Sequence, residues 1–333
     1  TLIAPAAKPA GSVWPAVLPQ TVVTVSAAAP YTNEGDTSVS SAVYVTATDG
    51  YVRAFKKDGS PKWQYQTDSA QPIRVSPLTV VEGGQVYLYV ADDNGDVYKL
   101  RDDNTVATRA WKKTIAGAAV RSALSCSDLF CTGDRFYFGA TDNTVRCLMK
   151  ANGDPCPDWK FSSAITSPIA GSLIIDERAT VSSAWVGLED GRMVSLRLSD
   201  GYSPTAFDKA GAAIKSSPLL DAKQAFVNNA LFFTSTDGKL YARVSSNLEQ
   251  LPSGWADYNA GAPIYSSPFM IPGSQYLYFG DDAGRLHKVS TEGVTAAGWP
   301  FQAGGAIKGM PVMVPGGYIA GVATSYIYFG SDD

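Results

Sequence analysis

A tryptophan recurs along this chain about every 48 residues, and this period restricts the possible fold more than any other feature. One phenylalanine stands in for a tryptophan in the series Trp14, Trp63, Trp111, Trp159, Phe207, Trp255 and Trp299. The successive intervals are 49, 48, 48, 48, 48 and 44 residues, and seven repeats fill the 333 residues because 333/7 is about 47.6. A repeat of 40–50 residues with several short strands is typical of a β-propeller.

The period also continues through the two ends of the chain. If the count runs on from the C-terminus into the N-terminus, Trp14 takes position 14 + 333 = 347. This position is 347 − 299 = 48 residues after Trp299, which is one more repeat. Strands from both termini would then share one blade and leave no free sheet edge. We therefore predict an all-β, single-domain, seven-bladed β-propeller of four-stranded blades over residues 1–333. The predicted parts are 1–20 (outer strands of the closing blade), 21–68, 69–115, 116–162, 163–210, 211–259 and 260–303 (blades one to six), and 304–333 (inner strands of the closing blade).

Each repeat is expected to contain the same four strands. Residues 43–63 show it best, because Asp49-Gly50 separates two apolar runs and is a strong hairpin signal. We predict the innermost strand of each repeat from a short pattern, of which residues 73–77 are an example. The pattern is isoleucine or valine, one variable residue, then small residues and often proline. The aromatic runs are predicted as second strands buried on both faces.

Composition and cysteine use restrict the compartment and the partners. The net charge of −4, from 27 basic and 31 acidic residues, argues against a nucleic-acid partner. No apolar run approaches the roughly 18 residues that a transmembrane helix needs. The chain starts at Thr1, so we expect that a signal peptide was removed and that the protein is secreted, periplasmic or on the cell surface.

Four cysteines are clustered in the third repeat. Their spacing does not fit the usual zinc sites, and disulfides are favoured over free thiols. Pairs of sequence neighbours are the simplest connectivity, although all three pairings stay open. We expect disulfides to hold two loops on one face. The bonded residues would be Cys126, Cys131, Cys147 and Cys156.

The repeat resembles that of the bacterial propellers named after pyrroloquinoline quinone (PQQ-like repeats). Residues 43–63, 87–111 and 231–255 carry the resemblance best, with a strand, a turn, a second strand and a closing tryptophan. The resemblance implies that the periodic aromatic residues dock between neighbouring blades. Family members include quinone-dependent alcohol dehydrogenases, a non-catalytic outer-membrane-assembly lipoprotein, and surface or pilus-tip proteins, so fold alone does not choose a function.

The residues give little support to catalysis. The quinone enzymes stack their cofactor on a disulfide between adjacent cysteines, and no two cysteines here are adjacent. His287 is the only histidine, which excludes a two-histidine metal site, and we expect its side chain to be solvated. Acidic pairs such as Asp102-Asp103 fall mostly in predicted turns. Residues 92–96 could form a Ca²⁺ loop but lack the ligand ladder of an EF-hand, so a turn is favoured.

One constellation could bind a ligand. The variable residue of the inner-strand pattern is basic in four of six copies. We call all six of these residues the rim residues: Arg74, Arg121, Thr166, Lys215, Tyr265 and Lys308. Cations at one depth around an axial channel would attract an anionic partner, unless neighbouring carboxylates neutralise them.

We predict a non-catalytic protein-interaction scaffold in a bacterial cell-envelope or extracellular assembly, with protein partners and with no cofactor or metal. The alternatives are a quinoprotein-like or glycan-cleaving enzyme, and a surface protein that binds a small anion or a glycan in the axial channel.

Overall fold

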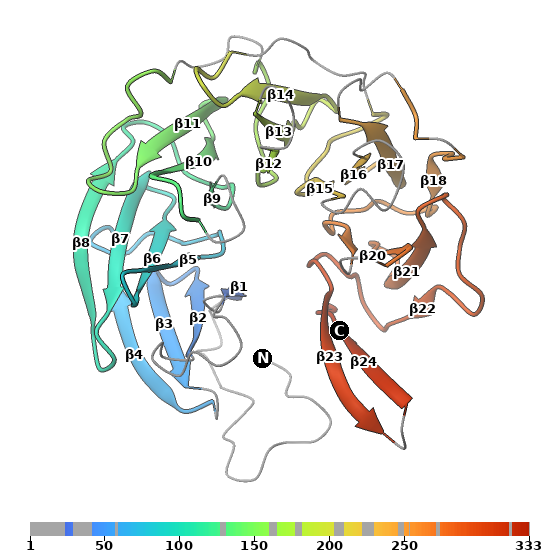
Figure 1. Ribbon diagram of the computed structural model, residues 1–333, viewed down its shortest axis with the longest axis horizontal. Coiled ribbons are helices and arrows are strands. Elements are labelled where there is room, and N and C mark those ends of the chain that lie inside the picture. The colour runs from blue at the N-terminus through green and yellow to red at the C-terminus, as the bar shows by residue number, and fades with distance from the viewer. Residues whose placement is uncertain are drawn as a thin grey trace. The chain divides into compact units, whose positions relative to one another are not determined.

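The computed structural model describes residues 24–28, 42–56, 59–126, 131–159, 165–176, 182–202, 210–221, 230–245, 250–252, 254–270, 274–319 and 322–332. The elements in these ranges are all β-strands (Figure 1). The chain divides into two compact units, residues 1–161 and 162–333, which are described separately. None of the described residues forms a helix long and apolar enough to cross a bilayer.

The first unit contains three antiparallel sheets, in which strands adjacent in sequence pair with each other. The first sheet is β1 (Thr24–Ala28), β2 (Ala42–Ala47), β3 (Tyr51–Lys56) and β4 (Pro61–Gln66). The second is β5 (Leu78–Glu82), β6 (Gln85–Ala91), β7 (Asp96–Asp102) and β8 (Ala107–Thr114). The third is β9 (Ser125–Cys126), β10 (Arg135–Ala140) and β11 (Thr144–Met149).

The second unit contains four more antiparallel sheets with the same sequential pairing. The first is β12 (Ile174–Asp176), β13 (Ser183–Gly187) and β14 (Met193–Arg197). The next is β15 (Leu219–Leu220), β16 (Ala230–Thr234), β17 (Lys239–Val244) and β18 (Tyr258–Asn259). It is followed by β19 (Phe269–Met270), β20 (Tyr276–Gly280), β21 (Arg285–Ser290) and β22 (Phe301–Gln302), and by the pair β23 (Val312–Ile319) and β24 (Val322–Tyr328).

These sheets confirm the prediction of an all-β chain built from short antiparallel strands. Four of the sheets have four strands in the described part of the chain. The count of seven blades, the blade boundaries and the closed ring stay predictions, because residues 1–23 lie outside the described ranges.

The prediction that residues 73–77 form the innermost strand of the second sheet was wrong. That strand, β5, begins only at Leu78, directly after Pro77. Proline has no N–H to donate to a ladder, so strand pairing starts after it. In the same way β15 begins after Pro218, and β19 begins after Pro268.

The segment before each inner strand instead ties neighbouring sheets together through the backbone. In the first unit the N–H of Ile73 donates to the carbonyl of Ala47, the last residue of β2, at 3.2 Å. In the second unit the N–H of Ile307 donates to the carbonyl of Asp281 at 3.0 Å. The same bond is made by Val120 to Asp92, Ile214 to Leu188, and Ile264 to Ser235.

The side chains of these tying residues are fully buried between sheets. Ile73, Val120, Ile214, Ile264 and Ile307 have no exposed surface. The first four of them pack with second-strand residues in apolar clusters that join neighbouring sheets of one unit. The recurring isoleucine is therefore the residue that positions one sheet against the next.

Candidate functional site

Each rim residue directly follows a buried isoleucine or valine, so the backbone just before it is held in place. The turn after the second strand of the same sheet closes the arrangement, because the N–H of Asp93 donates to the carbonyl of Pro72, and the N–H of Asp282 to that of Pro263, both at 2.9 Å. The turns themselves are held by carboxylates, since Asp49 Oδ1 accepts the N–H of Tyr51 at 3.1 Å. Side chains at these positions are thus displayed from a rigid backbone.

In the first unit two rim residues share one carboxylate. Arg74 Nε donates to Asp93 Oδ2 at 2.7 Å, and Arg121 Nε donates to Asp93 Oδ1 at 3.2 Å. Both arginine side chains are about half exposed, at 47% and 52%. Asp93 lies in the turn between β6 and β7, so one turn holds both cations.

In the second unit the rim cations each have their own acidic partner. Lys215 Nζ lies 3.5 Å from Glu189 Oε1. Lys308 Nζ lies 2.7 Å from Asp332 Oδ2 and 3.9 Å from Asp282 Oδ1. The hydrogen bond to Asp332 raises the pKa of Lys308.

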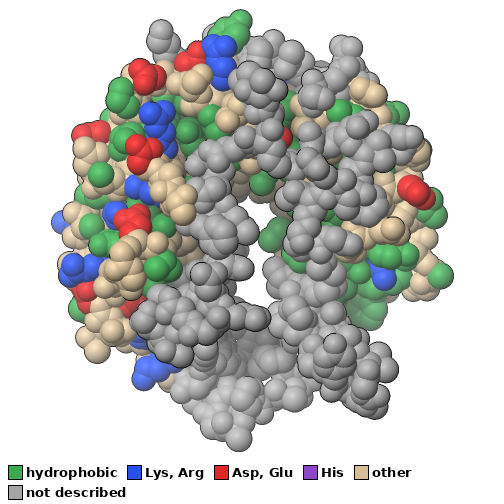
Figure 2. All heavy atoms as spheres, in the orientation of Figure 1, with side chains coloured by type: hydrophobic (Ala, Val, Ile, Leu, Met, Phe, Trp, Pro, Cys, Tyr) green, Lys and Arg blue, Asp and Glu red, His purple; other side chains and the backbone are tan. Residues whose placement is uncertain are grey.

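The two uncharged rim residues differ from each other. Thr166 accepts a hydrogen bond from Arg192 at 2.6 Å, and the Tyr265 ring is partly exposed. On the face drawn in Figure 2, Lys and Arg side chains lie among Asp and Glu side chains rather than in a patch of one sign. An anion would therefore compete with carboxylates already present, and anion binding by the whole set stays a prediction.

The periodic tryptophans lie at two kinds of contact. Trp63 Nε1 donates to Asp102 Oδ1 of the next sheet at 2.9 Å, and Trp111 Nε1 donates to the carbonyl of Lys150, also in the next sheet, at 2.9 Å. Trp159 and Trp255 bond within their own sheet, to the Val145 carbonyl and to Asp257. Trp14 and Phe207 lie outside the described residues.

Asp102 is a buried polar centre that the sequence did not reveal. Its carboxylate accepts hydrogen bonds from Tyr44, Lys62 and Trp63 of the neighbouring sheet, at 2.5, 2.6 and 2.9 Å. Burial would raise the pKa of Asp102, but these hydrogen bonds outweigh it and the pKa is lowered. Asp102 is thus a charged anchor between two sheets rather than a turn residue.

The expectation that His287 is solvated was wrong. The ring is 1% exposed and stacks on Phe279, with ring centroids 4.9 Å apart. Its Nε2 lies 2.9 Å from Asp281 Oδ2, and its Nδ1 lies 3.1 Å from the Tyr258 hydroxyl. Burial lowers the pKa of His287 even though Asp281 opposes that shift. The ring thus packs in the interior, held by contacts with Asp281, Tyr258 and Phe279.

The cysteines form the two predicted local disulfides, Cys126–Cys131 and Cys147–Cys156. The two disulfides lie close together, because the N–H of Lys150, which stands between Cys147 and Cys156 in sequence, donates to the carbonyl of Asp134 at 2.8 Å and Lys150 Nζ donates to that of Cys131. That the two bonds hold loops on one face stays a prediction.

Residues 92–96 form a turn, as favoured. Asp92 Oδ1 accepts the N–H groups of Asn94 and Asp96, both at 3.0 Å, while Asp92 Oδ2 accepts the Ser69 hydroxyl at 2.6 Å. Both Asp92 oxygens thus serve protein donors. Within the described ranges no three His, Cys, Asp or Glu side chains gather in a way that could hold a metal ion.

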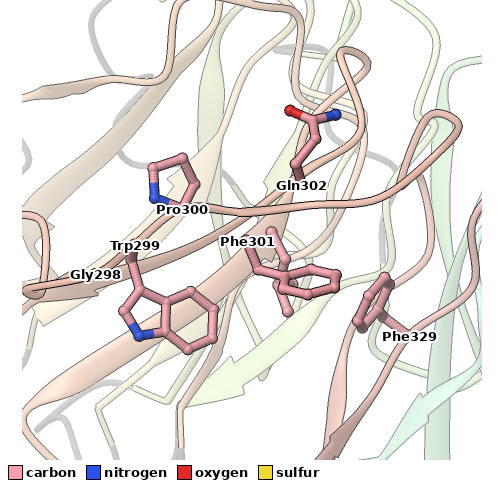
Figure 3. A pocket seen from close by; sticks show the side chains of 7 residues that line it. Gly298, Trp299, Pro300, Phe301, Gln302 and Phe329 are labelled. Atoms are coloured by element: carbon pink, nitrogen blue, oxygen red, sulfur yellow. The ribbon is translucent and has the colours of Figure 1, made fainter.

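An aromatic pocket of about 530 Å³ opens beside β22 in the second unit. Trp299 and Phe301 lie on one side of their strand and Pro300 and Gln302 on the other, and the Phe301 ring lies against Phe329, at 5.9 Å between centroids (Figure 3). Phe301 is 54% exposed. Exposed aromatic side chains gathered in this way are common at interaction surfaces.

Comparison with known proteins agrees with this architecture. Residues 1–105 match the family model described as outer membrane protein assembly factor BamB. Among curated protein sequences, none is significantly similar to the chain.

Three solved structures show the fold. BamB from Moraxella catarrhalis is 13% identical, with 82% of this chain and 76% of that chain covered and a TM-score of 0.58. The C-terminal WD40 domain of Sif2 is 14% identical, with coverages of 82% and 68% and a TM-score of 0.61. The computationally designed Ika8 protein is 11% identical, with coverages of 86% and 76% and a TM-score of 0.62. The match over residues 1–105 and these folds confirm that the chain resembles the PQQ-like repeat proteins, among them the outer membrane protein assembly factor BamB.

Proposed function

We propose that this chain is a non-catalytic protein-interaction scaffold of a bacterial cell envelope or an extracellular assembly. The observation that carries the proposal is the rim, where exposed charged and aromatic side chains project from a backbone fixed between sheets. A surface that is already ordered loses little conformational entropy when a protein binds it.

Two further findings agree with this proposal. The matching family model is described as an assembly factor of outer membrane proteins. The two disulfides are typical of an oxidising compartment, such as the periplasm or the cell exterior.

We further propose that the sheets are the blades of one seven-bladed ring, closed by strands from residues 1–20. The support comes from two of the four equivalents of Trp299 whose bonds are described above: Trp63 and Trp111 bond to the third-strand region of the next sheet, whereas Trp159 and Trp255 bond within their own sheets. Beyond Trp299 the next sheet is the two-stranded pair β23–β24 in the described part of the chain. If Trp299 docks as Trp63 and Trp111 do, the third strand of that sheet would lie beside the aromatic pocket that Trp299 lines.

The scaffold proposal is tested by capture from an envelope extract. The wild-type protein and the double variant Lys215→Ala/Tyr265→Ala serve as baits, and mass spectrometry quantifies what each retains. Val106→Ser is the control, because Val106 is exposed in the turn between β7 and β8 and is not a rim residue. We expect one stoichiometric partner with the wild type and the control, and its loss with the double variant. Absence of any partner, or retention by all three baits, contradicts the proposal.

A further inference from the structure

The cluster of Arg74, Asp93 and Arg121 holds more positive than negative charge. Its two guanidinium groups are held by opposite oxygens of one carboxylate, and the cluster therefore has a net charge of +1. Asp93 itself is largely buried, with 13% of its side chain exposed. The carboxylate thus fixes the two arginines while the outer parts of both remain open to solvent.

The donors of the two arginines are mostly unused. Each guanidinium has five N–H groups, and only Nε–H is engaged with Asp93. In the described part of the chain neither side chain has another hydrogen-bond or ion-pair partner. The paired NH₂ edges suit a carboxylate, because guanidinium binds that group through two parallel hydrogen bonds.

The rim of the second unit lacks this excess. Lys215 has Glu189, and Lys308 lies between Asp332 and Asp282, so each lysine already has at least one carboxylate of its own. An incoming acidic group would be repelled by those partners, and lysine cannot offer the two-pronged geometry of arginine.

We propose that Arg74 and Arg121 form a carboxylate-binding site that takes an acidic side chain of a protein partner. This inference rests on the proposed scaffold function and specifies the chemistry that the partner must present. A second carboxylate bound by both arginines would give two negative groups, itself and Asp93, for the two positive guanidinium groups. An acidic peptide segment fits this site, because it brings one carboxylate at a time to a small cluster on a protein of net charge −4.

The test measures binding of a fluorescein-labelled hexaglutamate peptide by fluorescence anisotropy in about 50 mM salt, where surface charges are weakly screened. Arg74→Ala and Arg121→Ala should each weaken binding about tenfold, as expected for one charge-assisted hydrogen-bonded pair. Lys215→Ala and Lys308→Ala are the matched controls and should change the Kd less than twofold. Asp93→Asn should tighten binding, because it raises the net charge of the cluster from +1 to +2 and removes the repulsion between Asp93 and the incoming carboxylate.

Several outcomes would overturn the site. These are no binding by the wild type at millimolar peptide, equal losses in the arginine and lysine variants, or weaker binding by Asp93→Asn. Thermal unfolding of every variant shows whether a loss reflects misfolding, and Arg121→Lys, which keeps the charge, should then recover only part of the affinity. If the peptide test fails but the capture experiment still yields a partner that depends on the rim residues, only the carboxylate site is rejected. Intact peptide binding with no captured partner rejects the scaffold.

Discussion

At the scale of single residues, the adjacent aspartates Asp102 and Asp103 have different roles. Asp102 is buried and accepts bonds from Tyr44, Lys62 and Trp63, whereas Asp103 is on the surface with Arg101. The partners of Asp102 are 39 to 58 residues away in the chain. No local pattern encodes such pairs, and sequence reasoning therefore assigned both aspartates to a turn.

The buried histidine predicts a specific pH dependence. His287 is the only histidine, and its folded pKa lies below the ordinary 6.5 because of burial. Between about pH 7 and its folded pKa the unfolded chain binds more protons than the native protein. The free energy of unfolding should therefore fall as the pH falls, by at most about 1.4 kcal/mol per pH unit for one proton.

Urea unfolding of the wild type and of His287→Gln between pH 7.5 and 5 measures this slope. The glutamine variant has no imidazole and should show a flatter profile over that window, whatever its stability at pH 7.5. A wild type that gains stability on acidification would mean that Asp281 raises the folded pKa of the histidine, opposite to our expectation.

At the scale of the elements, the repeating pattern was informative but its meaning was only partly predicted. Second strands and hairpin turns followed from aromatic runs and Asp-Gly pairs, which are local signals. The isoleucine before each inner strand was predicted as part of that strand, yet Ile307 acts by a backbone bond to Asp281 and by burial against the preceding sheet. A tie of this kind needs the neighbouring sheet, so the sequence of one repeat does not contain it.

Close packing at this tie predicts a large effect of one methyl group. A Cβ at Gly280 would collide with the Ile307 side chain and lie 2.6 Å from the Ile307 carbonyl oxygen. Gly280→Ala should therefore cost about 3 kcal/mol of stability, at the upper end for overpacking, because backbone must move. Gly309→Ala, where a Cβ meets nothing within 4 Å, is the matched control. Equal midpoints for the two variants in urea unfolding would show that the sheets adjust freely.

At the scale of the whole molecule, periodicity predicts the kind of sheet much better than it predicts how the sheets close. Each repeat encodes its own hairpins, and this is why the sheets of both units were predictable from a 48-residue spacing. Closure as we propose it would depend instead on pairing between segments at opposite ends of the sequence, such as residues 1–20 with β24. The repeat arithmetic supports that pairing but does not supply its contacts.

Ring closure predicts that residues 1–20 stabilise the entire fold. Deleting them should expose the edge of β24 and leave Phe301 and Phe329 uncovered, since the aromatic pocket would lose the strand proposed to fill it. We expect the unfolding midpoint to fall by about 5 °C or more, as for a loss of a few kcal/mol in a chain of this size, with increased binding of a hydrophobic dye. A synthetic peptide of residues 1–20 added in trans should restore the midpoint in proportion to its concentration, while a scrambled peptide should not. If the shortened protein keeps the wild-type midpoint and dye signal, residues 1–20 do not close the ring, and the aromatic pocket must be covered by another segment or partner.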